Sequence, residues 1–322
     1  MSVKVIIGDT EYFKGIDQIK YEFASDDQLC RTGIIEKYAS EKFDAILLVH
    51  SDYDPWANSI VSLEKQMYSM TSMRVPMQNV FKRVANGTMK WASCVFPTKG
   101  YSKLAGMEHE AYEKMILEAV GVNELKPIEF WKNLENDQAR MISKLKDKRI
   151  IHIEGEGTDL TLSIAGRKWI NCAGFSNLPD GEIYTGPVED SLEGCIYFKH
   201  PIMYKGNVAT GVRLVFKNGK CIKATAEEGE EYLRSMIALD EGSAYAGEFA
   251  IGTNAGIQVP TGHILLDEKI KGTIHIALGN GYPMTGSVNK SALHWDFICD
   301  LRENGRVTAD GETIMENGEI LI

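Results

Sequence analysis

Two histidines and one aspartate near the C-terminal end of the chain have the side chains and the spacing to bind a metal ion. His294 and Asp296 lie two residues apart in an apolar, strand-like run, and residues with this spacing project from the same face of a strand. His275 lies in a second strand-like run, so two neighbouring strands would bring the three side chains together. Sets of imidazole and carboxylate groups suit zinc, cobalt, manganese or iron. The other interpretation, in which each histidine is a hydrogen-bonded core residue, stays open.

Two glutamates stand in unusually apolar surroundings. Glu182 follows a turn and enters an apolar segment, and Glu248 is the one charged residue of the run 246–252. An acid in such a place is either part of an alternating surface pattern or a buried charge with a partner. Three carboxylates and two imidazoles exceed what one catalytic zinc with an open position needs. They suit two metal ions that share a bridging carboxylate and activate one water molecule.

The elements that would position these side chains change in character near residue 150. Before it, apolar runs of strand length at residues 3–7, 43–49 and 90–96 alternate with segments of helical spacing. This order predicts a small α/β domain at residues 1–149 with a mainly parallel sheet. The continuous apolar character of residues 43–49 is typical of a strand buried on both faces. Helices are expected at residues 107–120, closed by Gly121, and from Pro127 to about Lys148.

Residues 150–322 are rich in glycine and in strand-like alternation, as at residues 158–164. Asn218-Gly219 lies between two β-rich runs and predicts a hairpin turn. The same signal recurs in the tail at Asn304-Gly305, Asp310-Gly311 and Asn317-Gly318. One helix is expected, at about residues 227–239. The fold class is therefore α/β followed by a β-rich catalytic domain at residues 150–322, which contains all the candidate ligands.

The composition excludes several function classes. The chain has 322 residues and a net charge of −10, which disfavours nucleic acid as a partner. It has no run of eighteen apolar residues, so no membrane span is expected. The six cysteines form no C-x-x-C pair and the N-terminus has no signal-peptide character, which predicts a cytoplasmic protein with reduced thiols. The glycine-rich segments lack the third glycine of a dinucleotide fingerprint and the lysine of a P-loop.

Seven motifs in the second half of the chain recur in order in a known family. They are Gly157-Thr158-Asp159-Leu160, Gly166-Arg167, residues 177–187, Gly247-Glu248-Phe249-Ala250, His275-Ile276-Ala277-Leu278-Gly279, Tyr282 and residues 291–296. Together they resemble the thermophilic metallo-aminopeptidases of the aminopeptidase T, S and II type. The N-terminal half is similar more loosely, from Gly8 to Gly15.

The resemblance implies a cytosolic exopeptidase, typically a homodimer, that removes N-terminal residues from peptides with two divalent ions of zinc, cobalt or manganese. Carried over motif by motif, the metal ligands would be Glu182, Glu248, His275, His294 and Asp296. Tyr282 matches a tyrosine near the metals that is suited to stabilising an oxyanion. Glu182 or Glu248, whichever keeps a free oxygen, would carry a proton to the leaving amine. The resemblance does not tell which carboxylate bridges the metals.

Relative to the family, the chain starts several dozen residues late and the loop from Tyr282 to His294 is short. A shorter N-terminal domain is therefore expected, with consequences for the sheet, the substrate entrance and the dimer contacts. Two other functions stay open. One is a mononuclear iron dioxygenase that opens hydroxypyridine rings on the same scaffold, for which His275, His294 and Asp296 would suffice. The other is a catalytically degenerate homologue that binds without turnover.

Overall fold

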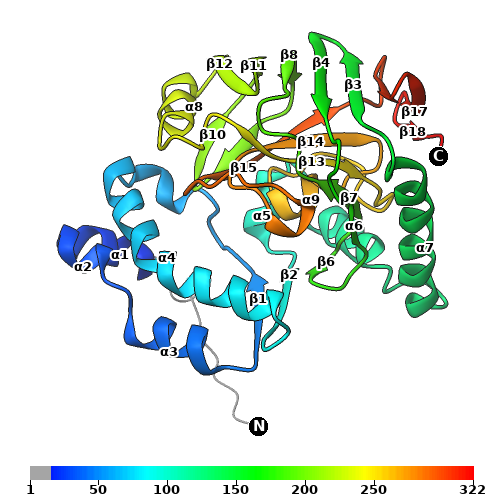
Figure 1. Cartoon of the computed structure of the whole chain (residues 1–322). Helices are drawn as coiled ribbons and strands as arrows, with labels where there is room; N and C mark the ends of the chain where they lie inside the picture. Colours follow the sequence, from blue (N-terminus) through cyan, green and yellow to red (C-terminus); the bar gives the residue numbers. More distant parts are fainter. Residues whose placement is uncertain (1–15) are drawn as a thin grey trace.

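The computed structural model describes residues 16–322, in which most helices precede residue 150 and most strands follow it (Figure 1). The strand predicted at residues 3–7 and the loose motif from Gly8 to Gly15 lie outside the described residues. The elements up to residue 149 are α1 Ile16–Phe23, α2 Asp26–Cys30, α3 Ile34–Lys42, β1 Ala45–His50, η1 Ala57–Ile60, α4 Leu63–Ala85, β2 Lys90–Val95, α5 Lys99–Leu104, α6 His109–Val120 and α7 Pro127–Leu145.

The predicted helices and the parallel sheet of the first part are confirmed. β1 pairs with β2 and β2 pairs with β6 (Asn177–Leu178), in both cases in parallel. Helix α6 ends at Gly121, whose φ of 70° is the left-handed conformation that favours glycine at a helix C-terminus. Helix α7 begins with Pro127 in its first turn, where a missing backbone N–H costs nothing.

The burial predicted for residues 43–49 is wrong, although the strand itself is present as β1. Leu47 is 66% exposed, Leu48 42% and Val49 47%. Among the described strands β1 lies at the edge of its sheet, with β2 as its one neighbour. An apolar run indicates a strand, but whether other elements cover that strand is decided by packing elsewhere in the chain.

The second part consists of two antiparallel sheets with short accessory elements. The larger sheet contains, in spatial order, β12 Lys220–Thr225, β11 Val212–Lys217, β8 Glu193–Phe198, β4 Thr158–Ser163, β3 Ile150–Gly155, β16 Arg306–Ala309, β17 Glu312–Glu316 and β18 Glu319–Ile320. The smaller sheet contains β15 His294–Asp300, β14 Thr273–Gly279, β13 Ala246–Gly252, β7 Glu182–Thr185 and β5 Ile170–Cys172. The remaining elements are β9 Ile202–Tyr204, β10 Asn207–Ala209, α8 Glu230–Ile237, α9 Ile264–Asp267 and η2 Pro283–Thr285.

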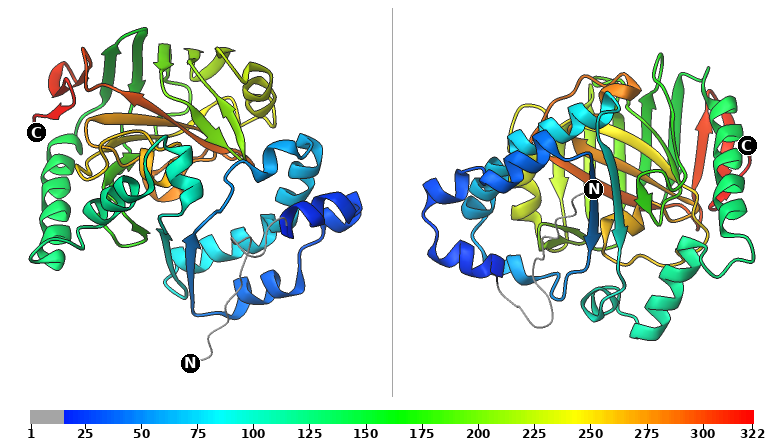
Figure 2. Two further views of the ribbon diagram at one scale, coloured as in Figure 1. Left: turned by 180° about the vertical axis from the view of Figure 1, so that it is seen from behind. Right: turned by 90° about the horizontal axis from the view of Figure 1, so that it is seen from below.

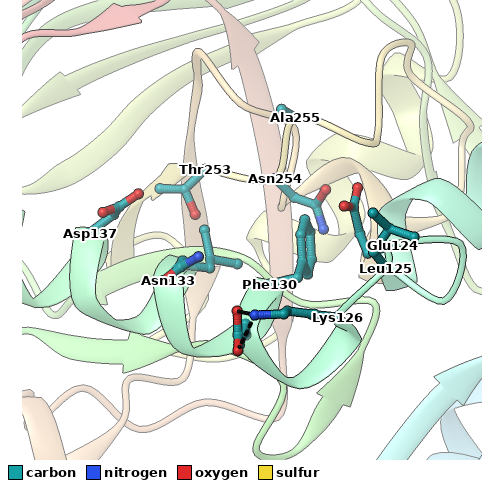
Figure 3. Close-up of a pocket in the computed structure, with 11 residues that line it drawn as sticks. Glu124, Leu125, Lys126, Phe130, Asn133, Asp137, Thr253, Asn254 and Ala255 are labelled. Atoms are coloured by element: carbon teal, nitrogen blue, oxygen red, sulfur yellow. Dashed lines mark hydrogen bonds and ion pairs between the residues drawn. The ribbon is translucent and has the colours of Figure 1, made fainter.

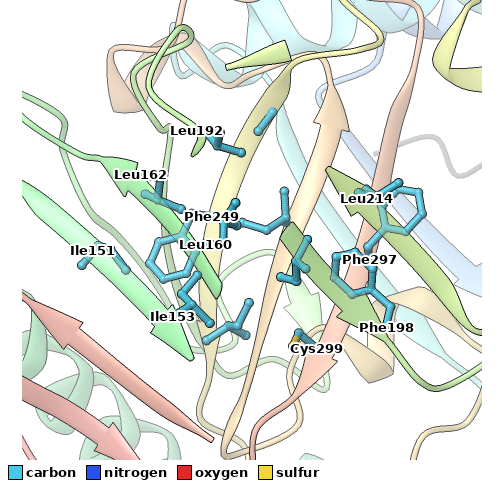
Figure 4. Packing of buried hydrophobic residues seen from close by; sticks show 14 of the residues in the cluster. Ile151, Ile153, Leu160, Leu162, Leu192, Phe198, Leu214, Phe249, Phe297 and Cys299 are labelled. Carbon is cyan, nitrogen blue, oxygen red and sulfur yellow. The ribbon is translucent and has the colours of Figure 1, made fainter. Parts of the chain in front are cut away.

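The main hydrophobic core lies between these two sheets. Leu160 and Leu162 of the larger sheet pack in one cluster with Phe249 and Phe297 of the smaller sheet (Figure 4). These four side chains have no exposed surface. Burial of large apolar side chains is the dominant favourable contribution to folding. The core therefore fixes the smaller sheet against the larger one and leaves the opposite face of the smaller sheet for other contacts.

Helices from the first part of the chain cover the region on the other side of the smaller sheet (Figure 1). Tyr101 of α5 and Ile116 of α6 share a second buried cluster with Leu266 of α9 and with Ile270. Helix α7 packs beside β5, which is the edge strand of the smaller sheet. Figure 2 shows α7 along one side of the molecule, near the C-terminus. The second cluster and the pairing of β6 with β2 both cross residue 150. The domain boundary at this residue stays a prediction.

Three of the four predicted glycine-containing hairpin turns are confirmed and one is wrong. Asn218-Gly219, with φ values of 48° and 76°, joins the paired strands β11 and β12, and the turns at residues 310–311 and 317–318 likewise join paired strands. Asn304-Gly305 instead connects β15 of one sheet to β16 of the other. A positive φ allows a tight turn but does not choose the partner of the next strand. No helix in the described part of the chain combines the length and apolar character needed to cross a membrane.

Candidate metal centre

All five predicted metal ligands lie on four neighbouring strands of the smaller sheet. Glu182 starts β7, Glu248 lies in β13, His275 in β14, and His294 and Asp296 in β15. In the ladders His275 is opposite Ala250, and Asp296 is opposite Ala277. Because side chains alternate along a strand, the residues between them, such as Phe249 and Ile276, point into the core. The five donors therefore share the face turned away from the core.

A β-bulge at Gly247 turns Glu248 toward this face. The register between β13 and β14 shifts between Ala246, which is opposite Leu278, and Glu248, which is opposite Ala277. Ala246 belongs to the core, and without the extra residue Glu248, two positions later, would also point there. A Cβ at Gly247 would lie 2.5 Å from the carbonyl oxygen of Asn280. The bulge thus requires a glycine.

The five side chains form two clusters that share Glu248. In the first cluster, His275 Nε2 lies 3.5 Å from Glu182 Oε2 and 3.6 Å from Glu248 Oε1. In the second cluster, His294 Nε2 lies 3.4 Å from Glu248 Oε2 and 3.5 Å from Asp296 Oδ1. Within each cluster one donor atom from every residue lies within 4.8 Å of the others. Distances of this size leave room for a cation among the donors.

The hydrogen bonds around the clusters prepare the donor atoms for a cation. Nδ1 of His294 donates to the backbone oxygen of Asn280 over 2.8 Å, which directs Nε2 toward Glu248. A second ring nitrogen held in this way is the usual arrangement for a metal-binding histidine. Glu182 Oε2 and Asp296 Oδ1 are buried without a hydrogen-bond partner. Unpartnered buried oxygens are costly, and divalent cations coordinated by these donors would remove that cost, so the residues present fit a metal centre.

The negative charges of the clusters also favour the binding of cations. Burial opposes protonation of His275, but the contact with Glu248 and the charge of Glu182 outweigh it and raise the pKa of His275 to about 9. For His294, burial is likewise outweighed, by Tyr282 and Asp296, and its pKa lies well above the usual value. Without metal the carboxylates therefore hold protons on both imidazoles. A metal ion supplies the same positive charge and replaces those protons.

The carboxylates differ in their surroundings. Burial raises the pKa of Glu182 even though the charge of Lys269 opposes the shift. Burial also acts to raise the pKa of Asp296, but the positive charge of His294, 3.5 Å from Oδ1, outweighs it, and the pKa falls to about 2. The pKa of Glu248 is lowered in the same way, because its contacts with His275 and His294 outweigh the effect of burial. Glu248 and Asp296 are thus held as anions between the imidazoles.

Sequence reasoning missed a buried lysine beside the first cluster. Lys269 has no exposed surface, and its Nζ donates over 2.6 Å to both Glu182 Oε1 and Glu268 Oε1. Asp180 Oδ1 lies 3.8 Å from the same nitrogen. Burial opposes the charge on Lys269, but the three carboxylates outweigh it and raise its pKa well above the ordinary value.

Two of the partners of Lys269 extend the set of possible metal donors. Glu268 groups with His275 and Asp296, and Asp180 groups with Glu182 and Cys172. The one feature of the sequence that could have indicated this lysine is the charged pair Glu268-Lys269, which lies between the apolar residues 264–266 and the strand of His275. Charged pairs at the end of a short helix are usually solvated, so this pattern by itself does not predict burial.

Tyr282 lies at the edge of the second cluster. Its hydroxyl is 3.4 Å from His294 Nε2, and its ring lies 5.3 Å from that of Tyr184. The charge of His294 acts to lower the pKa of Tyr282, but burial together with Glu248 and Asp296 raises it. The phenol therefore keeps its proton near neutral pH and is able to donate it in a hydrogen bond.

A cavity of about 470 Å³ lies outside the metal centre. Figure 3 shows it between α7, which contributes Phe130 and Asp137, and the segment Thr253–Ala255 after β13. Asn254, one of its lining residues, donates from its side-chain nitrogen to the backbone oxygen of Asp180. The residues that line this cavity include neither Tyr282 nor any of the five candidate ligands.

The sequence and the fold are similar to those of known proteins. Aminopeptidase AmpS of Bacillus subtilis (strain 168) is 30% identical over 262 residues, a match that covers 71% of this chain and 62% of that protein. This chain thus spans about three-fifths of the length of that relative. Wild-type AmpT of Thermus thermophilus has the same fold, with a TM-score of 0.81 at 22% identity over 95% of this chain and 85% of the other.

A second solved structure has a more distant fold likeness. The 2,5-dihydroxypyridine dioxygenase of Pseudomonas putida KT2440 gives a TM-score of 0.55 at 14% identity, over 92% of this chain and 98% of the other. At 22% and 14% identity, the similarities to these two solved structures are evidence of a shared fold alone. The family model described as thermophilic metalloprotease (M29) matches residues 6–320. The predicted resemblance is confirmed, and the chain belongs to the M29 family of thermophilic metalloproteases.

Proposed function

We propose that this protein is a metallo-aminopeptidase that releases N-terminal amino acids from peptides at a two-metal centre. The observation that carries the proposal is the pair of donor clusters joined at Glu248, with buried unpartnered oxygens on Glu182 and Asp296. The family supports it, as do the names of the relatives AmpS and AmpT, the first of which is called an aminopeptidase.

In this proposal Glu182, Glu248 and His275 hold one metal ion. The second ion would be held by Glu248, His294 and Asp296, and Glu248, with Oε1 toward His275 and Oε2 toward His294, would be shared by the two ions. Zinc, cobalt and manganese all accept such nitrogen and oxygen donors. When bound, a pair of such ions lowers the pKa of a shared water and polarises the scissile carbonyl.

Tyr282 stabilises the charge that develops on the substrate. Attack of water on the scissile carbonyl carbon forms a C–O bond and leaves negative charge on the former carbonyl oxygen. A phenol that keeps its proton donates a hydrogen bond to this oxyanion, which is the interaction that lowers the barrier. The position of the Tyr282 hydroxyl beside His294, 3.4 Å from Nε2, aims it at the metal centre.

A carboxylate completes the reaction by moving one proton. Water loses a proton when it attacks, and the leaving amine must gain one when the C–N bond breaks. Glu182 and Glu248 are the carboxylates proposed for this role. One oxygen of Glu182 is engaged by Lys269, which leaves Oε2 at the centre, whereas both oxygens of Glu248 lie at the centre and each faces a histidine.

The test removes one ligand at a time. His294→Ala and Asp296→Ala, assayed on leucine p-nitroanilide with added cobalt or zinc, should lose nearly all turnover. Near wild-type turnover in either variant would reject the assignment of the metal centre. A metal-loaded wild-type protein that releases no amino acid from a panel of peptides would favour the degenerate homologue instead.

The alternative of a ring-opening dioxygenase shares the fold, as the similarity to the Pseudomonas putida enzyme indicates. His275, His294 and Asp296 would satisfy a mononuclear iron site of the two-histidine, one-carboxylate kind. Glu182 and Glu248, which contact the same histidines, favour the two-metal hydrolase. Metal analysis separates the two functions, because about two ions per chain supports the peptidase and a single iron supports the oxygenase.

The homodimer and the cytoplasmic location also belong to this proposal. The dimer rests on the family resemblance and the location on the cysteine spacing. Light scattering coupled to gel filtration measures the mass in solution directly. A mass near 36 kDa, that of one chain, would contradict the dimer.

A further inference from the structure

Lys269 places a positive charge next to the first cluster of the metal centre, in contact with Glu182. Its side chain is fully buried, so Nζ cannot leave its carboxylate partners without opening the fold. The backbone on both sides of the side chain is also held. The backbone N–H of Asn254 donates to the carbonyl of Lys269 over 2.9 Å, and the N–H of Lys269 donates to Leu266 over 3.0 Å.

Lys269 forms an ion pair with a candidate ligand of the first cluster but, in the part of the chain that the structure describes, with none of the second. Among the described residues its ion pairs are with Glu182, Glu268 and Asp180. Glu182 is a member of the first cluster only. The ion pairs of the carboxylates in the second cluster, Glu248 and Asp296, are with the two histidines.

This asymmetry has an electrostatic consequence for cations. A positive charge in hydrogen-bond contact with a ligand carboxylate competes for its negative charge, and the competition is strong in a buried site. A divalent ion in the first cluster meets a Glu182 that is already neutralised on one oxygen. The carboxylates of the second cluster, Glu248 and Asp296, make no ion pair with Lys269 among the described residues, so a divalent ion there meets carboxylates that are not neutralised in this way.

We propose that Lys269 makes the two metal positions unequal, so that the second cluster binds a divalent ion first and the first cluster binds one later and more weakly. This inference rests on the proposed function, because it assumes a two-metal centre. Lys269 acts through Glu182 and is therefore a positioning residue, not a catalytic one. A purely orienting role predicts the opposite result, since loss of an outer partner that orients a ligand usually weakens metal binding about 10- to 100-fold.

The experiment measures metal binding directly. Metal-free protein is titrated with Co²⁺ and followed by visible absorption, and the bound metal is counted after equilibrium dialysis. Wild-type protein should bind two ions in two distinguishable steps. Lys269→Met, of similar length and without charge, should tighten the second step at least about tenfold and leave the first step nearly unchanged.

A neighbouring lysine provides the matched control. The side chain of Lys271 is 42% exposed and lies 4.0 Å from Glu319 Oε2, away from the centre. Lys271→Met should therefore titrate like the wild type. An unchanged or weaker second step in Lys269→Met, with Lys271→Met like the wild type, would overturn the inference.

A second pair of variants keeps the inference testable if Lys269→Met does not fold. In a protein that retains Lys269, Glu182→Gln should remove the weak step and keep the tight one. His294→Ala should remove the tight step and keep the weak one. The reverse assignment, or two equal steps in the wild type, would overturn the inference and leave the proposed function intact. A wild-type protein that binds no Co²⁺ at all would reject the metal centre itself, and the inference with it.

Discussion

The backbone oxygen of Asn280 lies 2.8 Å from Nδ1 of His294 and accepts a hydrogen bond from it. The same oxygen would lie 2.5 Å from a Cβ at Gly247, the bulge residue that turns Glu248 toward the centre. One carbonyl thus couples the orientation of a histidine in β15 to the backbone of β13. The positions of two candidate ligands therefore depend on one glycine without a side chain.

Gly247→Ala should disturb both ligands at once. The new methyl group must displace the Asn280 carbonyl, which rotates His294 and shifts the bulge. We expect metal affinity to fall about 10- to 100-fold, as for the loss of other outer partners of metal ligands, and activity to fall with it. The measurement is Co²⁺ content after dialysis together with turnover.

Gly155→Ala is a suitable control for this experiment. Its Cβ would meet a flexible leucine side chain, Leu301 Cδ2, at 3.1 Å. It should keep near wild-type metal content. If Gly247→Ala matches Gly155→Ala in metal content, the carbonyl of Asn280 does not couple the two strands.

Tyr282→Phe should reduce kcat and leave metal content unchanged. The variant keeps the ring that packs on Tyr184 and loses the hydroxyl beside His294. Loss of one donor to an oxyanion costs about 10²- to 10³-fold in kcat, and the effect on KM should be small. Steady-state kinetics at saturating Co²⁺ test this.

Tyr184→Phe serves as the matched control, because the Tyr184 hydroxyl donates to the sulfur of Met284 over 3.3 Å. We expect this variant to lose less than about tenfold in kcat. Equal losses in the two variants would argue for a packing role of the tyrosine pair rather than for stabilisation of an oxyanion.

His263 should make the fold less stable in mild acid. Burial lowers its pKa from 6.5 to about 3, so the unfolded chain binds a proton that the folded chain excludes. The stability it contributes is complete above pH 6.5 and falls as the pH drops toward 3, by up to about 1.4 kcal/mol per pH unit.

His263→Phe keeps a ring against Tyr101, whose centroid lies 4.6 Å from that of His263, and removes the titrating group. Urea unfolding at pH 7 and pH 4.5 should show a smaller loss of stability for the variant than for the wild type. Equal losses in both proteins would assign the acid sensitivity to other groups.

Phe249→Ala should destabilise the fold strongly, because Phe249 has no exposed surface and packs between the two sheets next to Trp169. Such truncations cost about 3–5 kcal/mol, measured by urea unfolding. Phe96→Ala, at a residue that is 59% exposed, should change stability by less than about 0.5 kcal/mol. A small effect at Phe249 would mean that the sheets are held together elsewhere.

The sequence by itself determined what depends on near neighbours in the chain. The period of two places His294 and Asp296 on one face of a strand, and Gly121 and Pro127 mark the helix ends that the structure has. The identities of the five candidate ligands came from motifs, and the structure places all five in two adjoining clusters. Whether they bind metal stays a prediction.

Tertiary structure decided what depends on partners far away in the chain. The adjacency of β7 to β13 brings Glu182 to the centre, the bulge at Gly247 turns Glu248, and the loop after α9 buries Lys269 beside Glu182. Packing far away in the chain also decides that β1 is exposed and that Asn304-Gly305 connects two sheets. Local pattern specifies which face of a strand a residue occupies, but strand pairing and burial come from packing over the whole chain, which a single sequence window does not contain.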